Sequence, residues 1–262
     1  MRLFTFDTET TGLEPGSRLL ELHSCLLAED GSTAAEFTAM VNPGMPIPPD
    51  VTAINHITDA MVTGCDDARA VLHRWLDWLD EHEARVGVAH FAPYDVGILG
   101  WELGRAGLRQ PDIDIICTKS MAAAIKATPK NNLQVLVEHY SIKRLGDAHR
   151  AQSDADACRQ YFLLARDIVA ASDHRSRWAP EYGYPTQLPP ALAGIDKAIA
   201  DGREFAFGYV DAKGVRTDRA IIPYGYAQTA NGIAFHGLCL MRKERRTFLA
   251  DRVQNAAAAG AG

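Results

Sequence analysis

The stretch FDTETTGL, Phe6 to Leu13, decides the fold. It ends a strand-like start over residues 1–7 and places Asp7 and Glu9 two positions apart. Because residues i and i+2 of a strand point to the same face, the two carboxylates would meet beside an apolar core. Desolvating both is costly unless a cation lies between them, and hard cations such as Mg²⁺ prefer carboxylate oxygens. Most such pairs, taken alone, are simply two solvated charges.

The composition is that of an ordinary globular protein. The 262 residues are 47% hydrophobic and 23% charged, which predicts one or two domains with a sizeable core. No apolar run is long enough to span a membrane, and the first residues do not resemble a secretory signal. Five scattered cysteines without a CxxC pair favour a reduced, cytoplasmic protein.

The charge is unevenly distributed along the chain. The net charge of −6 argues against nucleic-acid binding. Residues 187–262, however, hold 10 basic and 7 acidic side chains, so this part is positive. An acidic first part can still recruit a polyanion through bound cations.

The order of strand and helix patterns predicts an α/β domain with a mixed sheet, flanked by helices, over residues 1–172. Two further strand-like runs with a turn between them indicate an antiparallel meander after the first strand. Shorter strands then alternate with helices, one of which should end near Gly107. The expected strands are 17–27, 33–43, 85–90 and 112–117, and the expected helices are 68–84, 94–107, 132–142 and 153–171.

The remaining residues predict a connection and a second domain. Residues 173–187 are rich in proline and lack periodicity, which is typical of a linker. A helix at 191–202 and four short strand-like runs then predict a small, mostly β domain over residues 188–254. The alanine- and glycine-rich tail, residues 255–262, is expected to be disordered.

Three more polar residues stand where they can join the first two acids. Asp95 begins the helix after strand 85–90, Asp154 begins the helix 153–171, and His149 lies five residues before Asp154. Taken singly, each acid is typical of a helix cap and the histidine of a solvated side chain. Together with Asp7 and Glu9 they indicate a metal site with a base beside it.

These segments resemble a known family. FDTETTGL, AHFAPYD and HRAQSDAD are similar to the three motifs of the DEDDh 3′→5′ exonucleases, a proofreading-exonuclease family with a ribonuclease-H-like fold. The resemblance covers about residues 1–170. It implies that two Mg²⁺ or Mn²⁺ ions are held by carboxylates, that a histidine serves as general base, and that nucleoside 5′-monophosphates leave from a 3′ end. The implied metal ligands are Asp7, Glu9, Asp95 and Asp154, and the implied base is His149.

Residues near these motifs are candidates for contact with nucleic acid. The family usually has HNAxFD in its second motif, and Phe91 replaces the amide here. Phe91 and Tyr94 either stack on a base or pack in the core. Leu13 either wedges beside the terminal base or packs normally, and Thr10 with the turn after it offers donors to a phosphate or sugar.

The second part resembles another family. RAIIPYGY and CLMRKERRTFLADRV are similar to segments of the WYL domain, a small SH3-like β-barrel attached to bacterial regulators. The resemblance implies that the domain binds nucleic acid or a nucleotide-like effector, with Arg219, Arg242 and Arg246 at family positions. The basic run from Arg242 to Arg246 lies between Phe235 and Phe248, as in grooves that bind single strands. A solvated, charged hairpin is the alternative.

The sequence therefore predicts a metal-dependent 3′→5′ exonuclease acting on single strands or 3′ ends of DNA, with no membrane association. Two alternatives share the same residues: an exoribonuclease that trims RNA, and a nucleic-acid-binding regulatory module without turnover. Four intact acids argue against the second alternative, because a binding module has no need of a costly carboxylate cluster.

Overall fold

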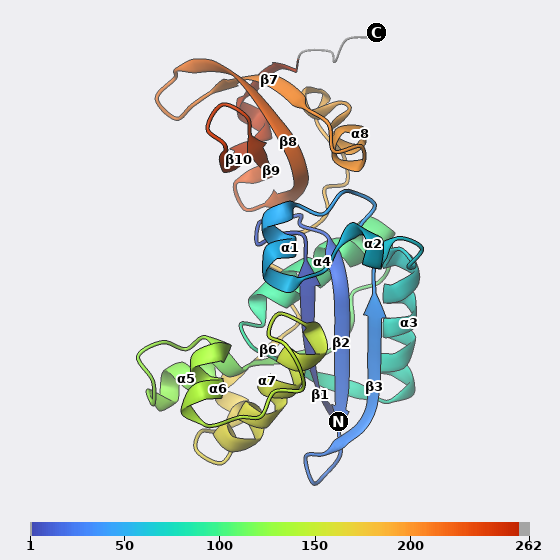
Figure 1. Ribbon diagram of the computed structural model, residues 1–262, viewed down its shortest axis with the longest axis vertical. Helices are drawn as coiled ribbons and strands as arrows, with labels where there is room; N and C mark the ends of the chain where they lie inside the picture. The colour runs from blue at the N-terminus through green and yellow to red at the C-terminus, as the bar shows by residue number, and fades with distance from the viewer. Residues whose placement is uncertain (1, 257–262) are drawn as a thin grey trace.

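The computed structural model describes residues 2–256, arranged as two parts along the long axis of the molecule (Figure 1). The predicted tail, 255–262, therefore lies outside the described residues from position 257 onward. The first part contains strands β1 (Arg2–Thr10), β2 (Leu19–Leu27), β3 (Thr33–Met40), β4 (Ala84–Ala89), β5 (Asp114–Cys117) and β6 (Arg175–Arg177), and helices α1 (Pro49–Asn55), α2 (Asp59–Val62), α3 (Ala68–Glu81), α4 (Pro93–Ala106), α5 (Thr118–Ile125), α6 (Leu133–His139) and α7 (Ala151–Ala165).

The six strands of the first part form one mixed sheet in the order β3-β2-β1-β4-β5-β6. β1, β2 and β3 make the antiparallel meander, whereas β1, β4 and β5 run parallel. The short β6 closes the far edge antiparallel to β5. The predicted α/β class with a mixed sheet is confirmed.

The alternation of side chains along β1 separates core from site. Phe4 and Phe6 are fully buried in the cluster that α3 and α4 cover, while Leu3 packs into the cluster that includes α7. The odd-numbered Asp7 and Glu9 continue the α7 side, because strand side chains alternate between the two faces. Helices therefore cover both faces, and the two acids lie under α7.

Helix α4 follows the capping signals in its sequence. Pro93 occupies its first turn, and Gly107 ends it with φ 65°, a left-handed conformation that glycine adopts without steric cost. The predicted end near Gly107 is confirmed. The eight-residue helix α5 was not predicted, because MAAAI gives no clear apolar stripe.

The second part is a five-stranded, entirely antiparallel sheet in the order β10-β9-β8-β7-β11. Its core contains the aromatic rings of Phe207, Phe235 and Phe248. Among the described residues no pairing joins β10 to β11, so closure into an SH3-like barrel is not confirmed. Its elements are the 3₁₀ turns Pro190–Leu192 and Ala250–Arg252, helix α8 (Ile195–Ala200), and strands β7 (Phe205–Val210), β8 (Arg216–Thr229), β9 (Gly232–Cys239), β10 (Glu244–Leu249) and β11 (Val253–Ala256).

The segment that connects the two parts, residues 173–187, packs along α4. It begins with the 3₁₀ turn Ala171–His174 and supplies β6. A Cβ on Gly100 would overlap the ring of Pro180, and one on Gly97 would lie 2.6 Å from the ring of Tyr182. The glycines of α4 therefore form a groove that this segment fills. Within residues 2–256, no helix combines the length and apolar character that a bilayer crossing requires.

Candidate active site

Three elements bring the predicted acids together at the C-terminal end of β1. Asp7 and Glu9 come from β1, Asp95 from the first turn of α4, and Asp154 from the first turn of α7. Glu9, Asp154 and His149 offer ligand atoms that all lie within 4.8 Å of one another. The Asp154 Oδ2 accepts a hydrogen bond from the backbone N–H of His149 at 3.2 Å, which holds the exposed imidazole beside the carboxylates.

Asp95 links α4 to the first strand. It is 2% exposed, and its Oδ1 accepts hydrogen bonds from the backbone N–H of Thr8 at 3.1 Å and from the Thr8 hydroxyl at 2.7 Å. Thr8 lies between the two acids of β1, so these bonds fix the position of the third acid relative to both.

The carboxylates carry an electrostatic cost that a cation would remove. Burial, together with repulsion from neighbouring carboxylates, raises the pKa of Glu9 to about 8. Burial also raises the pKa of Asp95 to about 7, and burial and then Asp95 raise that of Asp7 well above its usual value. Among the described residues, none of these three acids forms an ion pair with a basic side chain. A cluster of carboxylate oxygens without a cationic partner fits Mg²⁺ or Mn²⁺.

Two arginines that the sequence analysis missed hold the helix of the third motif. Arg150 forms a two-pronged ion pair with Glu21 of β2, at 2.7 and 3.0 Å, and Glu21 also accepts the backbone N–H of Ala151 at 3.0 Å. Glu21 stands opposite Glu9 in the sheet register, so Arg150 neutralises an acid next to the site. Arg144 forms an ion pair with Asp154. The sequence signal that could have identified these two arginines was the positive charge in the residues just before α7.

The side chains at the turn after β1 that were predicted to contact nucleic acid lie in two different environments. Thr10 is buried, and its hydroxyl bonds to the Tyr94 hydroxyl, which donates to the Gly12 carbonyl at 2.8 Å. The Thr10 oxygen lies at the same distance from that carbonyl, so both side chains hold the turn. Leu13 is 81% exposed. A role for these residues in binding nucleic acid stays a prediction.

Phe91 is held at the surface in an unusual conformation. It is 48% exposed, and the ammonium of Lys119 lies 3.9 Å from the centre of its ring. Its φ of 67° is left-handed, as is the 61° of His149, and bulky residues adopt this region only at a cost. Asparagine, the usual family residue, tolerates that conformation, so Phe91 occupies a backbone suited to a different side chain.

Of the arginines predicted to bind ligand in the second part, Arg242 and Arg246 lie just before and on the edge strand β10, and Arg219 lies on the central strand β8. Arg242 and Arg246 are exposed, and Arg246 pairs with Glu244 at 2.9 Å. Arg219 is half-buried and donates to the Thr217 hydroxyl at 2.9 Å. The expectation that aromatic rings flank this run as a binding surface is wrong: Phe235 and Phe248 are buried in the core of the second part and stack on each other.

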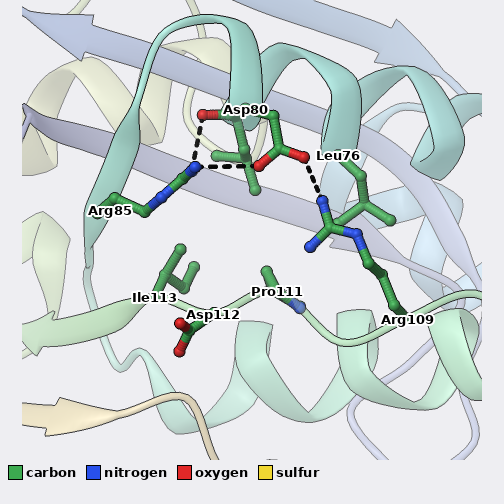
Figure 2. Close-up of a pocket in the computed structure, with 8 residues that line it drawn as sticks. Leu76, Asp80, Arg85, Arg109, Pro111, Asp112 and Ile113 are labelled. Carbon is green, nitrogen blue, oxygen red and sulfur yellow. Dashed lines mark hydrogen bonds and ion pairs between the residues drawn. The ribbon is translucent and has the colours of Figure 1, made fainter.

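A cavity of about 300 Å³ lies beside the N-terminal ends of β4 and β5, away from the acid cluster, and Figure 2 shows the residues that line it. Asp80 of α3 lies between the guanidinium groups of Arg85 and Arg109 and pairs with both. The carboxylate of this pocket therefore has cationic partners, whereas Asp7, Glu9 and Asp95 form no ion pair with a basic side chain among the described residues. The acid cluster remains the candidate site.

Comparisons with known proteins agree with these motifs. The exonuclease family model matches residues 4–162, and the WYL-domain model matches residues 190–258. The chain is 32% identical over 168 residues to the PolC-type DNA polymerase III of Lacticaseibacillus paracasei, covering 63% of this chain and 11% of that protein. It is also 32% identical over 161 residues to the epsilon subunit of DNA polymerase III from Treponema pallidum, covering 60% of this chain and 73% of that one.

The chain thus spans only about a tenth of the PolC-type polymerases that it matches. Among solved structures, the nuclease domain of 3′hExo, a DEDDh family member, bound to rAMP, superimposes with a TM-score of 0.56 at 16% identity, covering 64% of this chain and 91% of that chain. This likeness shows the ribonuclease-H-like fold. Since the exonuclease model covers more than half of the residues, the chain belongs to the exonuclease family, and residues 190–258 that follow match the WYL-domain model.

Proposed function

We propose that the chain removes nucleotides from the 3′ ends of single-stranded DNA in a reaction that requires Mg²⁺ or Mn²⁺. The observation that carries this proposal is the convergence of Glu9, Asp154 and His149 at the end of β1 beside the buried Asp95. DNA is the preferred substrate because two of the matched relatives are named as parts of DNA polymerase III.

Asp7, Glu9, Asp95 and Asp154 would hold two ions. The ions, when bound, supply positive charge for the attacking and leaving oxygens of an in-line displacement at phosphorus. The protein contributes the fixed positions of the acids: Thr8 orients Asp95, and the His149 backbone orients Asp154. These three hydrogen bonds fix the two carboxylates before substrate arrives.

His149 is proposed as the base that accepts a proton from the attacking water. Its imidazole is exposed, and a ring nitrogen lies within 4.8 Å of carboxylate oxygens of both Glu9 and Asp154. Leu13 and Phe91 are proposed to contact the terminal bases, because both apolar side chains are exposed near the site.

The WYL domain is proposed to bind nucleic acid or a nucleotide-like effector through Arg219, Arg242 and Arg246. Arg242 and Arg246 are exposed at the edge strand, where a strand backbone can reach them. The cytoplasm is the proposed compartment, because all five cysteines are unpaired, as is usual in reducing surroundings.

Trimming of RNA is the second candidate function. The observation in its favour is the fold shared with a DEDDh nuclease whose structure contains rAMP. A contact with the 2′-hydroxyl would decide between the two substrates.

The test is a panel of 3′-labelled DNA and RNA oligonucleotides, single- and double-stranded, with Mn²⁺ or with a chelator. Wild type should shorten single-stranded DNA only with Mn²⁺, and Asp7→Ala and Asp154→Asn should each lose at least a thousandfold in rate. Glu29→Gln, an exposed acid on the β2–β3 turn, is the matched control and should equal wild type. Full activity of either site variant would refute the assignment, and faster shortening of RNA would favour the second candidate.

A further inference from the structure

The two parts of the molecule meet through direct backbone contact. Gly16, in the turn after β1, has a φ of 91°, and a Cβ there would overlap the backbone of Tyr226 in β8. A Cβ on Gly225 would likewise overlap the carbonyl group of Gly16. The indole N–H of Trp101 in α4 donates to the Tyr226 carbonyl at 2.8 Å. These contacts leave little freedom for the WYL domain to reorient.

Arg245 of β10 is the main charged link across this junction. Its guanidinium forms a bidentate ion pair with Asp50 of α1, at 2.7 and 2.9 Å, and also bonds to Glu14 at 3.2 Å. The same group stacks over the Tyr224 ring at 4.9 Å and is only 20% exposed. A planar guanidinium held on three sides keeps its position better than a flexible ammonium would.

The two ion-pair partners of Arg245, Asp50 and Glu14, lie in segments that are connected to the acid cluster. Asp50 lies in the first turn of the two-turn helix α1, which lies at the junction of the two parts (Figure 1). The same helix ends at Asn55, whose side chain is 2% exposed and accepts the Ile57 N–H at 3.1 Å. Asn55 also forms a side-chain hydrogen bond with Glu9. Asn55 therefore helps to hold a proposed metal ligand.

The second connection between Arg245 and the acid cluster runs through the turn after β1. Glu14 lies in this turn, and a Cβ on Gly12 would lie 2.6 Å from the Nη1 of Arg245, so the guanidinium rests against the turn itself. His236 lies 3.8 Å from Glu14, but burial lowers its pKa to about 4 and leaves it neutral at pH 7. Arg245 is thus the cation that Glu14 faces.

We infer that Arg245 is a positioning residue of the nuclease: it holds α1 and the turn after β1 in the places from which Asn55 and the end of β1 orient Glu9. The WYL domain is then a structural part of the active site as well as a binding domain. This inference rests on the proposed function, since it assumes that Glu9 binds metal.

The test compares Arg245→Gln with Arg203→Gln, which removes an ion pair inside the second domain (Arg203 to Asp201, 2.8 Å) without touching the first. Asp50→Asn removes the same link from the other side at a 61% exposed position, so it serves if Arg245→Gln folds poorly. The measurements are kcat and KM on a short 3′-labelled DNA strand, and the dissociation constant for Mn²⁺ by calorimetry.

Arg245→Gln and Asp50→Asn should each lower kcat about tenfold and weaken Mn²⁺ binding about tenfold with little change in KM, whereas Arg203→Gln should equal wild type. Wild-type values in the two single variants would overturn the inference. Asp7→Ala measured alongside separates the two claims: if it stays active, the proposed function fails, whatever Arg245→Gln does.

Discussion

Replacing Asp95 with asparagine should stabilise the metal-free protein at alkaline pH while it abolishes nuclease activity. The asparagine Oδ1 can accept both bonds from Thr8 that Asp95 accepts now. What the change removes is the cost of ionising a buried carboxyl group. Above about pH 7 the group is ionised in the folded and in the unfolded protein, and the full cost is present. Below about pH 4 it is protonated in both, and the cost is absent.

The size of the effect follows from the pKa of Asp95, about 7 in the folded protein against 3.8 normally. At 1.36 kcal/mol per unit, the raised pKa costs the folded state about 4 kcal/mol at pH 8, where the group is ionised in both states, and about 2 kcal/mol at pH 5, where it is ionised only in the unfolded state. The stability gained by Asp95→Asn should therefore be about 2 kcal/mol larger at pH 8 than at pH 5.

The assay is urea unfolding of both proteins at pH 5, 6.5 and 8 in the presence of a chelator, with Glu29→Gln as an exposed control. Saturating Mn²⁺ should reverse the order at pH 8, because wild type gains binding energy that the variant has lost. A difference that stays constant with pH, or an asparagine variant less stable than wild type at pH 8 without metal, would refute the electrostatic account of this site.

Three further predictions test other parts of the molecule. His149→Ala should flatten the acid limb of the pH–rate profile, and an unchanged limb would remove His149 from the role of base. Phe91→Asn should raise the free energy of unfolding by about 1 kcal/mol, because asparagine tolerates the left-handed backbone, yet should raise KM severalfold; urea unfolding and steady-state kinetics check both signs. Glu102→Ala should destabilise by about 4 kcal/mol in urea unfolding, since it leaves the partly buried Arg18 and Arg105 without their fully buried partner; a loss below about 1 kcal/mol would contradict this.

Local signals in the sequence were enough to predict the frame of the site. Alternation along β1 put Asp7 and Glu9 on one face, and capping chemistry put Gly107 at the end of α4. Both follow from backbone periodicity and from the conformational preferences of single residues, which can be recognised within a few sequence positions.

Contacts between distant segments could not be predicted in this way. Arg245 read as part of a basic surface run, because nothing near it in sequence announces Asp50, which lies 195 positions away. Residues 173–187 read as a plain linker because their side chains fill the glycine groove of α4 one at a time, without a repeating pattern. Phe235 and Phe248 looked available to bases because pattern alone does not say which face of a short strand a small core needs.

The packing of residues 173–187 along α4 has a consequence for how this chain can change over generations. A tether that floats in solvent tolerates insertions, deletions and exchange of the module it carries. Here Pro180 and Tyr182 lie against Gly100 and Gly97. A residue inserted before them would displace both rings from these glycines. Recombination that brought in a different C-terminal module should therefore require a crossover after Tyr184, so that residues 173–184 are inherited together with the nuclease, and a module that still supplies the contacts made by Arg245.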